Sequence, residues 1–199
     1  MEPIYKQEAR QRFVAAQKKV DNALYQTTHK TGASVLKQIL WYVVNGVFFK
    51  SSLFPLSPLK ITILKLFGAK LGNGVVIKPC VNIKYPWRLT VGDYTWIGEK
   101  VWIDNLEDVV IGNSVCLSQG ALLLTGTHDH TRVKFDFLAS PIHLEDGVWI
   151  GAKAVVAGGV RCRSHCILGI NSVAETDLQP YTIYKGNPAV AVVKRSVSE

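Results

Sequence analysis

Several features are missing from this sequence of 199 residues, and each absence narrows its possible functions. The four cysteines, Cys80, Cys116, Cys162 and Cys166, form neither a CxxC pair nor the spacing of a zinc site. Met1 is followed by a polar, charged stretch where a secretory signal would have an apolar core. We therefore expect reduced cysteines, no bound metal and a cytoplasmic location.

The chain also lacks a basic run interleaved with aromatic residues and an apolar run long enough to span a membrane. Its formal net charge is +8, so its surface should attract anions, but the basic residues gather near the two ends. This pattern argues against nucleic acid as a partner. The most apolar segment, residues 39–49, is shorter than the roughly 20 residues that a membrane span requires. It is either a helix buried against the main body or a helix lying on a membrane face, with Lys37 and Lys50 at its flanks.

What the sequence does contain is an internal repeat of six residues that starts at Leu71. Each unit opens with an aliphatic residue or Cys162, and its second residue is often glycine. The fifth position is small or β-branched: Val75, Val81, Thr95, Val101, Val115, Ala121, Val148, Ala154, Val160, Cys166 and Ser172. The openers Leu71, Val91 and Ile111 lie 20 residues apart, so three units with one insertion make one turn.

The period of six predicts a coil with a triangular cross-section. Each unit supplies a short strand and a corner, with the opener pointing inward and the small fifth residue near the crowded corner. Successive turns then stack as parallel strands about 4.8 Å apart. An α-helical body is excluded because its apolar period would be 3.6. The sequence therefore predicts a mainly β, parallel coil.

The remaining segments suggest helices before the coil and a short element after it. With 48% apolar and 19% charged residues, the chain has the composition of one globular domain. Helices are expected over residues 5–26, where the chain is amphipathic or partly disordered, and over 33–50 and 57–68. The last has Ser57 as N-cap, Pro58 at the first helical position and Gly68 as terminator. The predicted organisation is a helical region at 1–68 capping the first turn, a coil at 69–179 with an extruded loop at 124–141, and a terminal segment at 180–199.

Several stretches carry a resemblance to a known family: "LFGAKLGNGVVI", "YPWRLTVGDYTWIGEKVWIDNLEDVVIGNSVCLSQGALLLTGTHDH", "VWIGAKAVVAGGV" and "YKGNPA". Over about residues 60–195 the chain resembles the hexapeptide-repeat acyltransferases, whose fold is the left-handed parallel β-helix. It is most similar to the colanic-acid-biosynthesis type of sugar O-acetyltransferase, which is related to the galactoside and maltose acetyltransferases. The resemblance implies acetyl-CoA as co-substrate, no metal, and a homotrimer with active sites between neighbouring subunits.

The resemblance also implies a catalytic residue in the loop that interrupts the repeat. In the family, a histidine after a Thr/Ser-Gly-x step is the general base, and the matching residue here is His128 in "TGTHD". A neutral imidazole takes the proton of the acceptor hydroxyl as the oxygen attacks the thioester. Transfer is direct, so no cysteine nucleophile is required. The neighbouring His130 is expected to be a solvated side chain or a secondary substrate contact.

The acceptor side of the site is expected from the longer unit "IDNLED" that precedes the loop. Its extra length should project Asp104 and Asn105 outward, and we expect both to contact the sugar. The family's acidic residue would fall on Leu106, so this chain departs from the pattern there. The alternative for both residues is an ordinary turn role.

The resemblance places coenzyme A along the later turns of the coil. The expected contacts are Trp149, Gly151, Ala152, Gly169, Ile170, Lys185, Lys194 and Arg195. Trp149 would pack on the pantetheine arm, backbone groups of the Gly and neighbouring residues would bond its amides, and the basic residues would bind phosphates. The alternatives are ordinary packing for the indole and solvated surface charge for the basic residues.

The leading hypothesis is an acetyl-CoA-dependent O-acetyltransferase that acts on a sugar of a surface polysaccharide, such as an exopolysaccharide, capsule or O-antigen, or on its lipid-linked or nucleotide-linked precursor. Peripheral contact with the inner face of the cell membrane through residues 39–49 is left open. Acetylation of an amino sugar or of serine is the second hypothesis. A zinc enzyme of the carbonic anhydrase type would need three converging histidines, whereas His128 and His130 share one loop. A non-catalytic trimeric scaffold is the remaining alternative.

Overall fold

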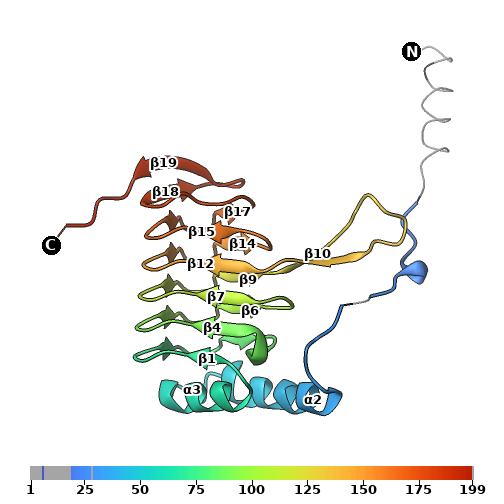
Figure 1. Ribbon diagram of the computed structural model, residues 1–199, viewed down its shortest axis with the longest axis horizontal. Helices are drawn as coiled ribbons and strands as arrows, with labels where there is room; N and C mark the ends of the chain where they lie inside the picture. The colour runs from blue at the N-terminus through green and yellow to red at the C-terminus, as the bar shows by residue number, and fades with distance from the viewer. Residues whose placement is uncertain (1–5, 7–18, 28, 199) are drawn as a thin grey trace. The chain divides into compact units, whose positions relative to one another are not determined.

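A computed structural model describes residues 6, 19–27 and 29–198, and a regular β-coil forms its main body (Figure 1). The chain divides into two compact units, one made of residues 1–29 and 128–138 and the other of 30–127 and 139–199. The expected helix at 5–26 lies mostly outside the described residues. Of its described part, Lys6 is helical and residues 19–26 contain one helical turn, η1 (Asn22–Leu24). The coil belongs to the second unit.

The coil consists of three sheets whose strands follow one another around each turn. The first sheet has the order β1 (Lys70–Leu71), β4 (Leu89–Val91), β7 (Val109–Ile111), β12 (Ile142–Leu144) and β15 (Arg161–Cys162). The second runs β2 (Val76–Ile77), β5 (Trp96–Ile97), β8 (Cys116–Leu117), β13 (Trp149–Ile150), β16 (Ile167–Leu168), β18 (Thr182–Lys185) and β19 (Val190–Lys194). The third runs β3 (Asn82–Ile83), β6 (Trp102–Asp104), β9 (Leu122–Leu124), β14 (Val155–Ala157) and β17 (Val173–Ala174). All pairings are parallel except β18 with β19, which confirms the predicted fold class.

The interior of the coil is a column of aliphatic side chains stacked in register. In the second sheet, for example, Ile77 pairs with Ile97, and Ile97 pairs with Leu117. All three side chains have no exposed surface. Trp96 precedes Ile97 in β5, and Trp149 precedes the buried Ile150 in β13. Both indoles point outward, because successive side chains of a strand face opposite sides of the sheet. The repeat therefore determines which side chains form the core and which form stacked columns on the outer surface of the coil.

One corner of the triangle is stabilised by a ladder of short polar side chains. The Asp93 carboxylate accepts a hydrogen bond from the Asn73 N–H at 2.6 Å. The Asn113 side chain accepts one from the Asp93 N–H at 2.8 Å, and Asp146 one from the Asn113 N–H at 2.7 Å. The next residue in each turn has a left-handed backbone, as at Tyr94 with φ of 54°. Each corner is thus tied to the following turn through a side chain.

Three helical segments cover the open end of the first turn: α2 (Val35–Val44), the π-helix η2 (Asn45–Phe49) and α3 (Ser57–Leu66). The indole N–H of Trp41 donates to the Ile83 carbonyl at 2.9 Å, and the Asn45 amide donates to the Asn82 side chain at 2.8 Å. The first bond pairs a backbone carbonyl at the edge of the third sheet, and the second holds the helical segment to a side chain of the same strand. No helix among the described residues is long and apolar enough to cross a membrane.

Helix α3 covers the same edge with two further side chains. The Ser57 hydroxyl accepts the Ile77 N–H at 2.9 Å, so Ser57 is the first residue of the helix and not the N-cap that we predicted. The ammonium of Lys60 is buried and donates to the Lys78 carbonyl at 2.9 Å. Burial lowers the pKa of Lys60 from its ordinary value, because water no longer stabilises the charge.

The stacking distance of the coil yields a stability prediction for Gly98. A Cβ at Gly98 would lie 2.6 Å from the Leu117 carbonyl oxygen, which belongs to the rigid backbone of the next turn. Gly98→Ala should therefore lower the free energy of unfolding by about 1–3 kcal/mol. In the matched variant Gly46→Ala the Cβ meets no atom within 4 Å, so stability should be kept or raised slightly. Urea unfolding of both variants checks this, and equal losses in the two would refute it.

Candidate functional site

The predicted base, His128, is the last residue of β10 (Gly126–His128), which pairs with β11 (Phe137–Ala139) in a hairpin that leaves the coil. Its Nδ1 lies 3.0 Å from the Phe135 carbonyl oxygen. A carbonyl can only accept, so Nδ1 carries the hydrogen and Nε2 keeps its lone pair. This is the tautomer that a general base acting through Nε2 requires.

Aromatic rings surround the imidazole of His128 within its own unit. The ring of Phe135 stacks on it at 4.4 Å with an interplanar angle of 5°. Phe137 and Tyr25 lie at 5.6 and 5.8 Å between ring centroids, in tilted or edge-on orientations. Phe135 has a left-handed backbone with φ of 50°, which is unfavourable for a bulky residue. Thus one residue supplies both the carbonyl that fixes the tautomer and the ring that fixes the plane.

The rest of the loop is held by charged side chains next to His128. The Asp129 carboxylate accepts hydrogen bonds from the Thr131 hydroxyl and N–H at 2.6 and 3.0 Å, and these bonds lower the pKa of Asp129. Arg132 bridges Asp129 at 3.2 Å and Asp136 at 3.3 Å. His130 is exposed. The two loop histidines therefore differ: one is oriented by protein contacts and the other is open to solvent.

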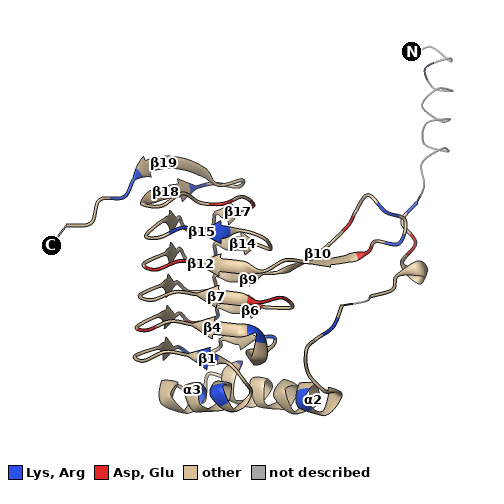
Figure 2. Cartoon of the chain, in the orientation of Figure 1, with Lys and Arg blue, Asp and Glu red and all other residues tan. Residues whose placement is uncertain are grey.

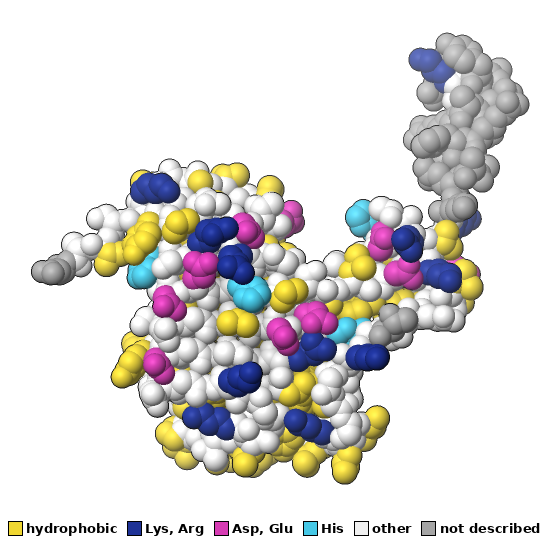
Figure 3. Space-filling model, viewed as in Figure 1, with side chains coloured by type: hydrophobic (Ala, Val, Ile, Leu, Met, Phe, Trp, Pro, Cys, Tyr) yellow, Lys and Arg dark blue, Asp and Glu magenta, His cyan; other side chains and the backbone are white. Residues whose placement is uncertain are grey.

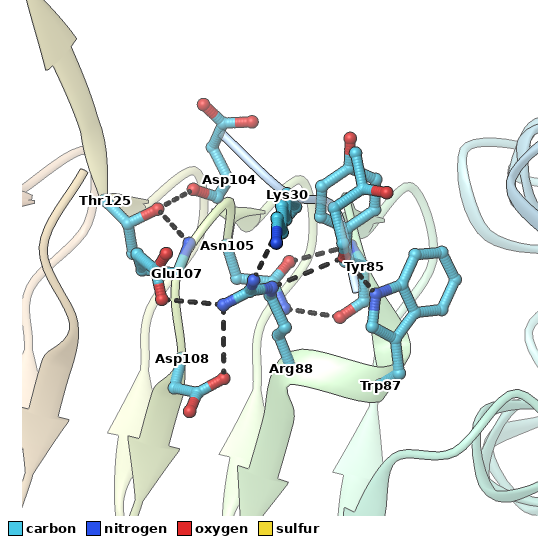
Figure 4. Close-up of polar contacts among 10 residues, drawn as sticks. Lys30, Tyr85, Trp87, Arg88, Asp104, Asn105, Glu107, Asp108 and Thr125 are labelled. Carbon is cyan, nitrogen blue, oxygen red and sulfur yellow. Dashed lines mark hydrogen bonds and ion pairs between the residues drawn. The ribbon is translucent and has the colours of Figure 1, made fainter. Parts of the chain in front are cut away.

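The predicted acceptor residue Asp104 ends strand β6 at a corner of the coil (Figure 4). Its side chain is mostly buried, and Oδ1 lies 3.7 Å from the Lys84 ammonium. Among the described residues, no donor makes a hydrogen bond to this oxygen. The Thr125 hydroxyl donates to the Asp104 carbonyl at 2.7 Å and holds the corner to the next turn. A buried carboxylate with spare acceptor capacity is suited to receive a hydroxyl group.

Asn105 does not project outward as we expected. It has no exposed surface, and its side-chain oxygen accepts the Tyr85 N–H at 2.9 Å. Its amide donates back to the Tyr85 carbonyl at 2.6 Å. Asn105 therefore holds the corner residue of the preceding turn, and in this conformation its side chain cannot reach a sugar. Burial, with a smaller effect of the Asp104 charge, raises the pKa of Tyr85.

Arg88 organises the flank of the same corner (Figure 4). Its guanidinium bonds to the Glu107 carboxylate at 2.6 Å and lies 3.7 Å from Asp108. It also donates to the backbone carbonyls of Lys30 at 2.7 Å and Thr31 at 3.4 Å. The segment that leads into α2 is thereby attached to the acceptor corner.

Trp149 stands on the outward column of the second sheet, as the prediction for the coenzyme requires. It pairs with Cys116 on one side and Ile167 on the other, and 43% of its surface is exposed. Its indole N–H donates to the Ser118 hydroxyl at 2.9 Å, which fixes the ring against the coil. Burial raises the pKa of the neighbouring Cys116 thiol, so this thiol is not activated as a nucleophile.

The four predicted backbone contacts fall into two kinds. The N–H of Gly151 donates to the Leu168 carbonyl at 2.7 Å, and that of Gly169 to the Tyr184 carbonyl at 2.8 Å, so both donors are used within the coil. The N–H groups of Ala152 and Ile170 make no hydrogen bond within the described part of the chain. These two donors are therefore the ones available to the amides of a pantetheine arm.

The predicted phosphate-binding residues are not equivalent either. Arg195 donates to the carbonyls of Gly147 at 2.9 Å and His165 at 3.1 Å, which fastens the C-terminal segment to two corners. The Lys194 ammonium donates to the Thr182 hydroxyl at 2.9 Å. Lys185 is exposed, and a Cβ added at Gly169 would lie 3.0 Å from its Cγ. Of the three, Lys185 is the side chain next to the predicted backbone contacts.

Sequence reasoning missed the residues that orient the candidate groups. The sequence patterns assign no role to Phe135, Lys84, Tyr85 or Ser118, and only the spacing of 20 residues between Tyr85 and Asn105 hints that these two meet on adjacent turns. All four cysteines are free thiols. In the described residues, no group of three or more His, Cys, Asp or Glu side chains is arranged to hold a metal ion.

Comparisons with known proteins give close and distant relatives, although no family model matches the chain. A protein of Escherichia coli K12 described as the colanic acid biosynthesis acetyltransferase WcaF is 37% identical over 168 residues, covering 84% of this chain and 92% of that protein. The galactoside O-acetyltransferase of the same strain is 25% identical over 130 residues, or 64% of each chain. A crystal structure of a hexapeptide-repeat acetyltransferase from Vibrio cholerae with acetyl-CoA has a TM-score of 0.75 at 21% identity, covering 87% of this chain and 97% of that one.

The buried position of Asn105 gives a prediction that separates a positioning role from sugar contact. Asn105→Ala leaves the Tyr85 N–H unpaired and removes one of the two hydrogen bonds to the Tyr85 carbonyl, which still accepts the Arg88 N–H. The free energy of unfolding should therefore fall by about 1–3 kcal/mol. Asn73→Ala removes an exposed side chain and should change stability by less than about 0.5 kcal/mol. If Asn105→Ala kept full stability and only raised KM for the acceptor, Asn105 would be a substrate contact.

Proposed function

This chain belongs to the hexapeptide-repeat acetyltransferases, and we propose that it transfers an acetyl group from acetyl-CoA to a hydroxyl of a sugar in surface-polysaccharide biosynthesis. The observation that supports His128 as the general base is its orientation, because its Nδ1 is hydrogen-bonded to the backbone carbonyl of Phe135. The sugar class is supported by the relatives named for colanic acid biosynthesis and for galactoside acetylation.

In the proposed reaction, His128 Nε2 accepts the proton of the acceptor hydroxyl while the hydroxyl oxygen attacks the thioester carbonyl carbon. Acetyl-CoA supplies the activated acyl group. The C–O bond forms and the C–S bond breaks, and the imidazolium returns its proton to the departing sulfur. The products are an acetyl ester and free coenzyme A, and the imidazole is neutral again. General-base catalysis of this kind contributes about 10²–10⁴ to the rate.

The acceptor is proposed to lie at the corner formed by Asp104. Its Oδ1 has no hydrogen-bond donor among the described residues and lies 3.7 Å from the Lys84 ammonium. An ionised carboxylate accepts hydroxyl hydrogens but donates none, which suits a sugar with several hydroxyl groups. Asn105 is proposed to act through Tyr85, by keeping this corner in place.

The coenzyme is proposed to lie along the outward face of the later turns. Trp149 would contact the pantetheine arm, the N–H groups of Ala152 and Ile170 would bond its amides, and Lys185 would pair with a phosphate. Homotrimer formation, with sites between subunits, is supported by the outward indoles Trp96 and Trp102, which are 60% and 43% exposed. The loop of one subunit would then bring His128 to a neighbour's groove.

We further propose that the protein acts in the cytoplasm and touches the inner face of the cell membrane through residues 39–49. The free thiols of all four cysteines are typical of a reducing compartment. Within that segment Trp41 and Phe49 pack on the first turn of the coil, whereas Ile39, Leu40 and Tyr42 are exposed. The segment is therefore partly buried and partly available to a lipid surface.

The reaction itself is tested by an acceptor screen with acetyl-CoA, read as release of free thiol. Galactosides, glucosides, fucosides and an amino sugar should be compared, with serine as a further acceptor. We expect turnover with a neutral sugar and a product heavier by one acetyl group that hydroxylamine cleaves, because esters are labile to hydroxylamine and amides are not. A stable amide product would show that the acceptor is an amine and would overturn the proposal of O-acetylation.

The role of His128 is tested by His128→Ala. The variant should lose about 10²–10⁴ in kcat, with the affinity for coenzyme A unchanged, because the base touches the acceptor and not the coenzyme. His130→Ala is the matched control in the same loop and should keep near-normal rates, since its side chain is exposed. Near-normal kcat in His128→Ala, or an equal loss in His130→Ala, would remove His128 from its assigned role.

A further inference from the structure

A groove of about 710 Å³ lies between the helical cap and the acceptor corner of the coil. One wall consists of α2 and η2, with Ile39, Tyr42, Val43 and Val47, and most of the groove surface is apolar. The other wall consists of Asn82, Lys84, Tyr85 and Trp102 on the first two turns. This volume is in the range of ligand pockets, and all lining residues belong to the same compact unit.

The helical wall exposes apolar side chains where a soluble protein normally has polar ones. Tyr42 is 80% exposed and Val43 is 55% exposed, so α2 is apolar on its outer side as well as on the side that packs on the coil. Figure 3 shows apolar side chains and cations side by side along the edge where α2 and α3 lie. An apolar surface of this kind marks a binding site for an apolar ligand or partner.

The charged residues that line the groove are both basic. No Asp or Glu occurs between Asn22 and Gly92, a stretch that contains nine basic residues: Lys30, Lys37, Lys50, Lys60, Lys65, Lys70, Lys78, Lys84 and Arg88. In Figure 2, helices α2 and α3 carry cations and no acid. Two of the nine, Lys50 and Lys84, line the groove itself. The occupant is therefore expected to carry negative charge as well as an apolar part.

The groove reaches the place where the acceptor is proposed to react. Lys84 lines the groove and also lies 3.7 Å from Asp104 Oδ1. Tyr85, the next residue, lines the groove as well and is held by Asn105. A ligand that extends from the apolar wall toward the corner would pass a cation before it reaches the carboxylate.

We propose that this groove binds an anionic amphiphile, and that the acceptor is a sugar joined through phosphate to an apolar chain. The chain would lie against Ile39, Val43 and Val47, the phosphate at Lys84 with Lys50 nearby, and the sugar at Asp104. The identity of the ligand as acceptor rests on the proposed function, whereas its binding to the groove does not. The same chemistry in a phospholipid membrane is the alternative that the experiment separates.

Gly46 allows a test that fills the groove without disturbing the fold. Gly46 lines the groove, and a Cβ there would meet no atom within 4 Å. Gly46→Phe places a ring in the space, and Gly46→Ala is the matched control with a single methyl. Binding of dodecyl phosphate and of the neutral dodecyl maltoside, both below micelle formation, is measured by calorimetry. Unfolding in urea confirms that both variants are folded.

We expect the unaltered protein to bind dodecyl phosphate at least about tenfold more tightly than dodecyl maltoside, and Gly46→Phe to lose at least about tenfold in affinity while Gly46→Ala retains it. Equal binding of dodecyl phosphate to all three proteins would overturn the proposal. A second result would also overturn it, namely that anionic phospholipid vesicles bind the unaltered protein and Gly46→Phe alike and dodecyl phosphate binds neither protein. The exposed side of α2 would then be a surface that docks on a membrane.

Binding of acetyl-CoA, measured on the same samples, separates this proposal from the proposed function. Gly46→Phe should bind acetyl-CoA normally, because the predicted coenzyme contacts lie on later turns of the coil. Groove binding without turnover on any sugar would refute the acetyltransferase proposal and leave the groove assigned. Turnover on free sugars without binding of dodecyl phosphate to the groove would refute the groove proposal and leave the acetyltransferase proposal standing.

Discussion

Each turn of this coil satisfies its backbone groups only through the turns above and below it. The N–H of Gly98 donates to the Leu117 carbonyl, and that of Gly151 to the Leu168 carbonyl, so a turn without a neighbour would leave a row of polar groups unpaired. Such rows of unpaired backbone groups are therefore confined to the first and the last turn of the coil, and other parts of the chain must cover both turns. At the last turn the cover is the antiparallel strand β19, and at the first turn it is the helical segments with Trp41, Asn45, Ser57 and Lys60.

The same constraint explains how the chain accommodates a catalytic loop. A turn can release a long loop only at a corner, where no ladder bond is lost, and the hairpin β10–β11 leaves between Thr125 and Ser140, whose backbones are still joined by a bond of 3.0 Å. This bond keeps the two ends of the loop together at the corner of the coil. The orientation of His128 is then set by the loop itself, through the Phe135 carbonyl and ring, and not by the repeat.

The repeat could be predicted from the sequence because its inward positions recur at a fixed period. The aliphatic residue that opens each six-residue unit faces the same interior on every turn. The polar side chains at the corner of Asp104 and Asn105 do not recur in this way. Asn105 was expected to face a substrate, yet it bonds to Tyr85 on the preceding turn, because the partner of a polar side chain depends on which corners are stacked. Ser57 was expected to cap its own helix, but its hydroxyl accepts the hydrogen bond of the Ile77 N–H on the first turn of the coil. A periodic pattern indicates which side chains are buried, whereas the hydrogen-bond partners of polar side chains depend on contacts between residues far apart in the sequence.

The cap also accounts for the unusual surface of the helices. Open backbone groups of the first turn must be met by polar side chains, so Lys60 is directed inward even though its burial costs solvation. Leu66 on the same helix is 79% exposed, and the outer side of α2 is apolar. This reversal of the usual polarity leaves an apolar face, with no acidic residue in the chain from Asn22 to Gly92, directly beside the acceptor corner. Covering the coil and presenting a surface for an anionic amphiphile are thus two consequences of the same helices.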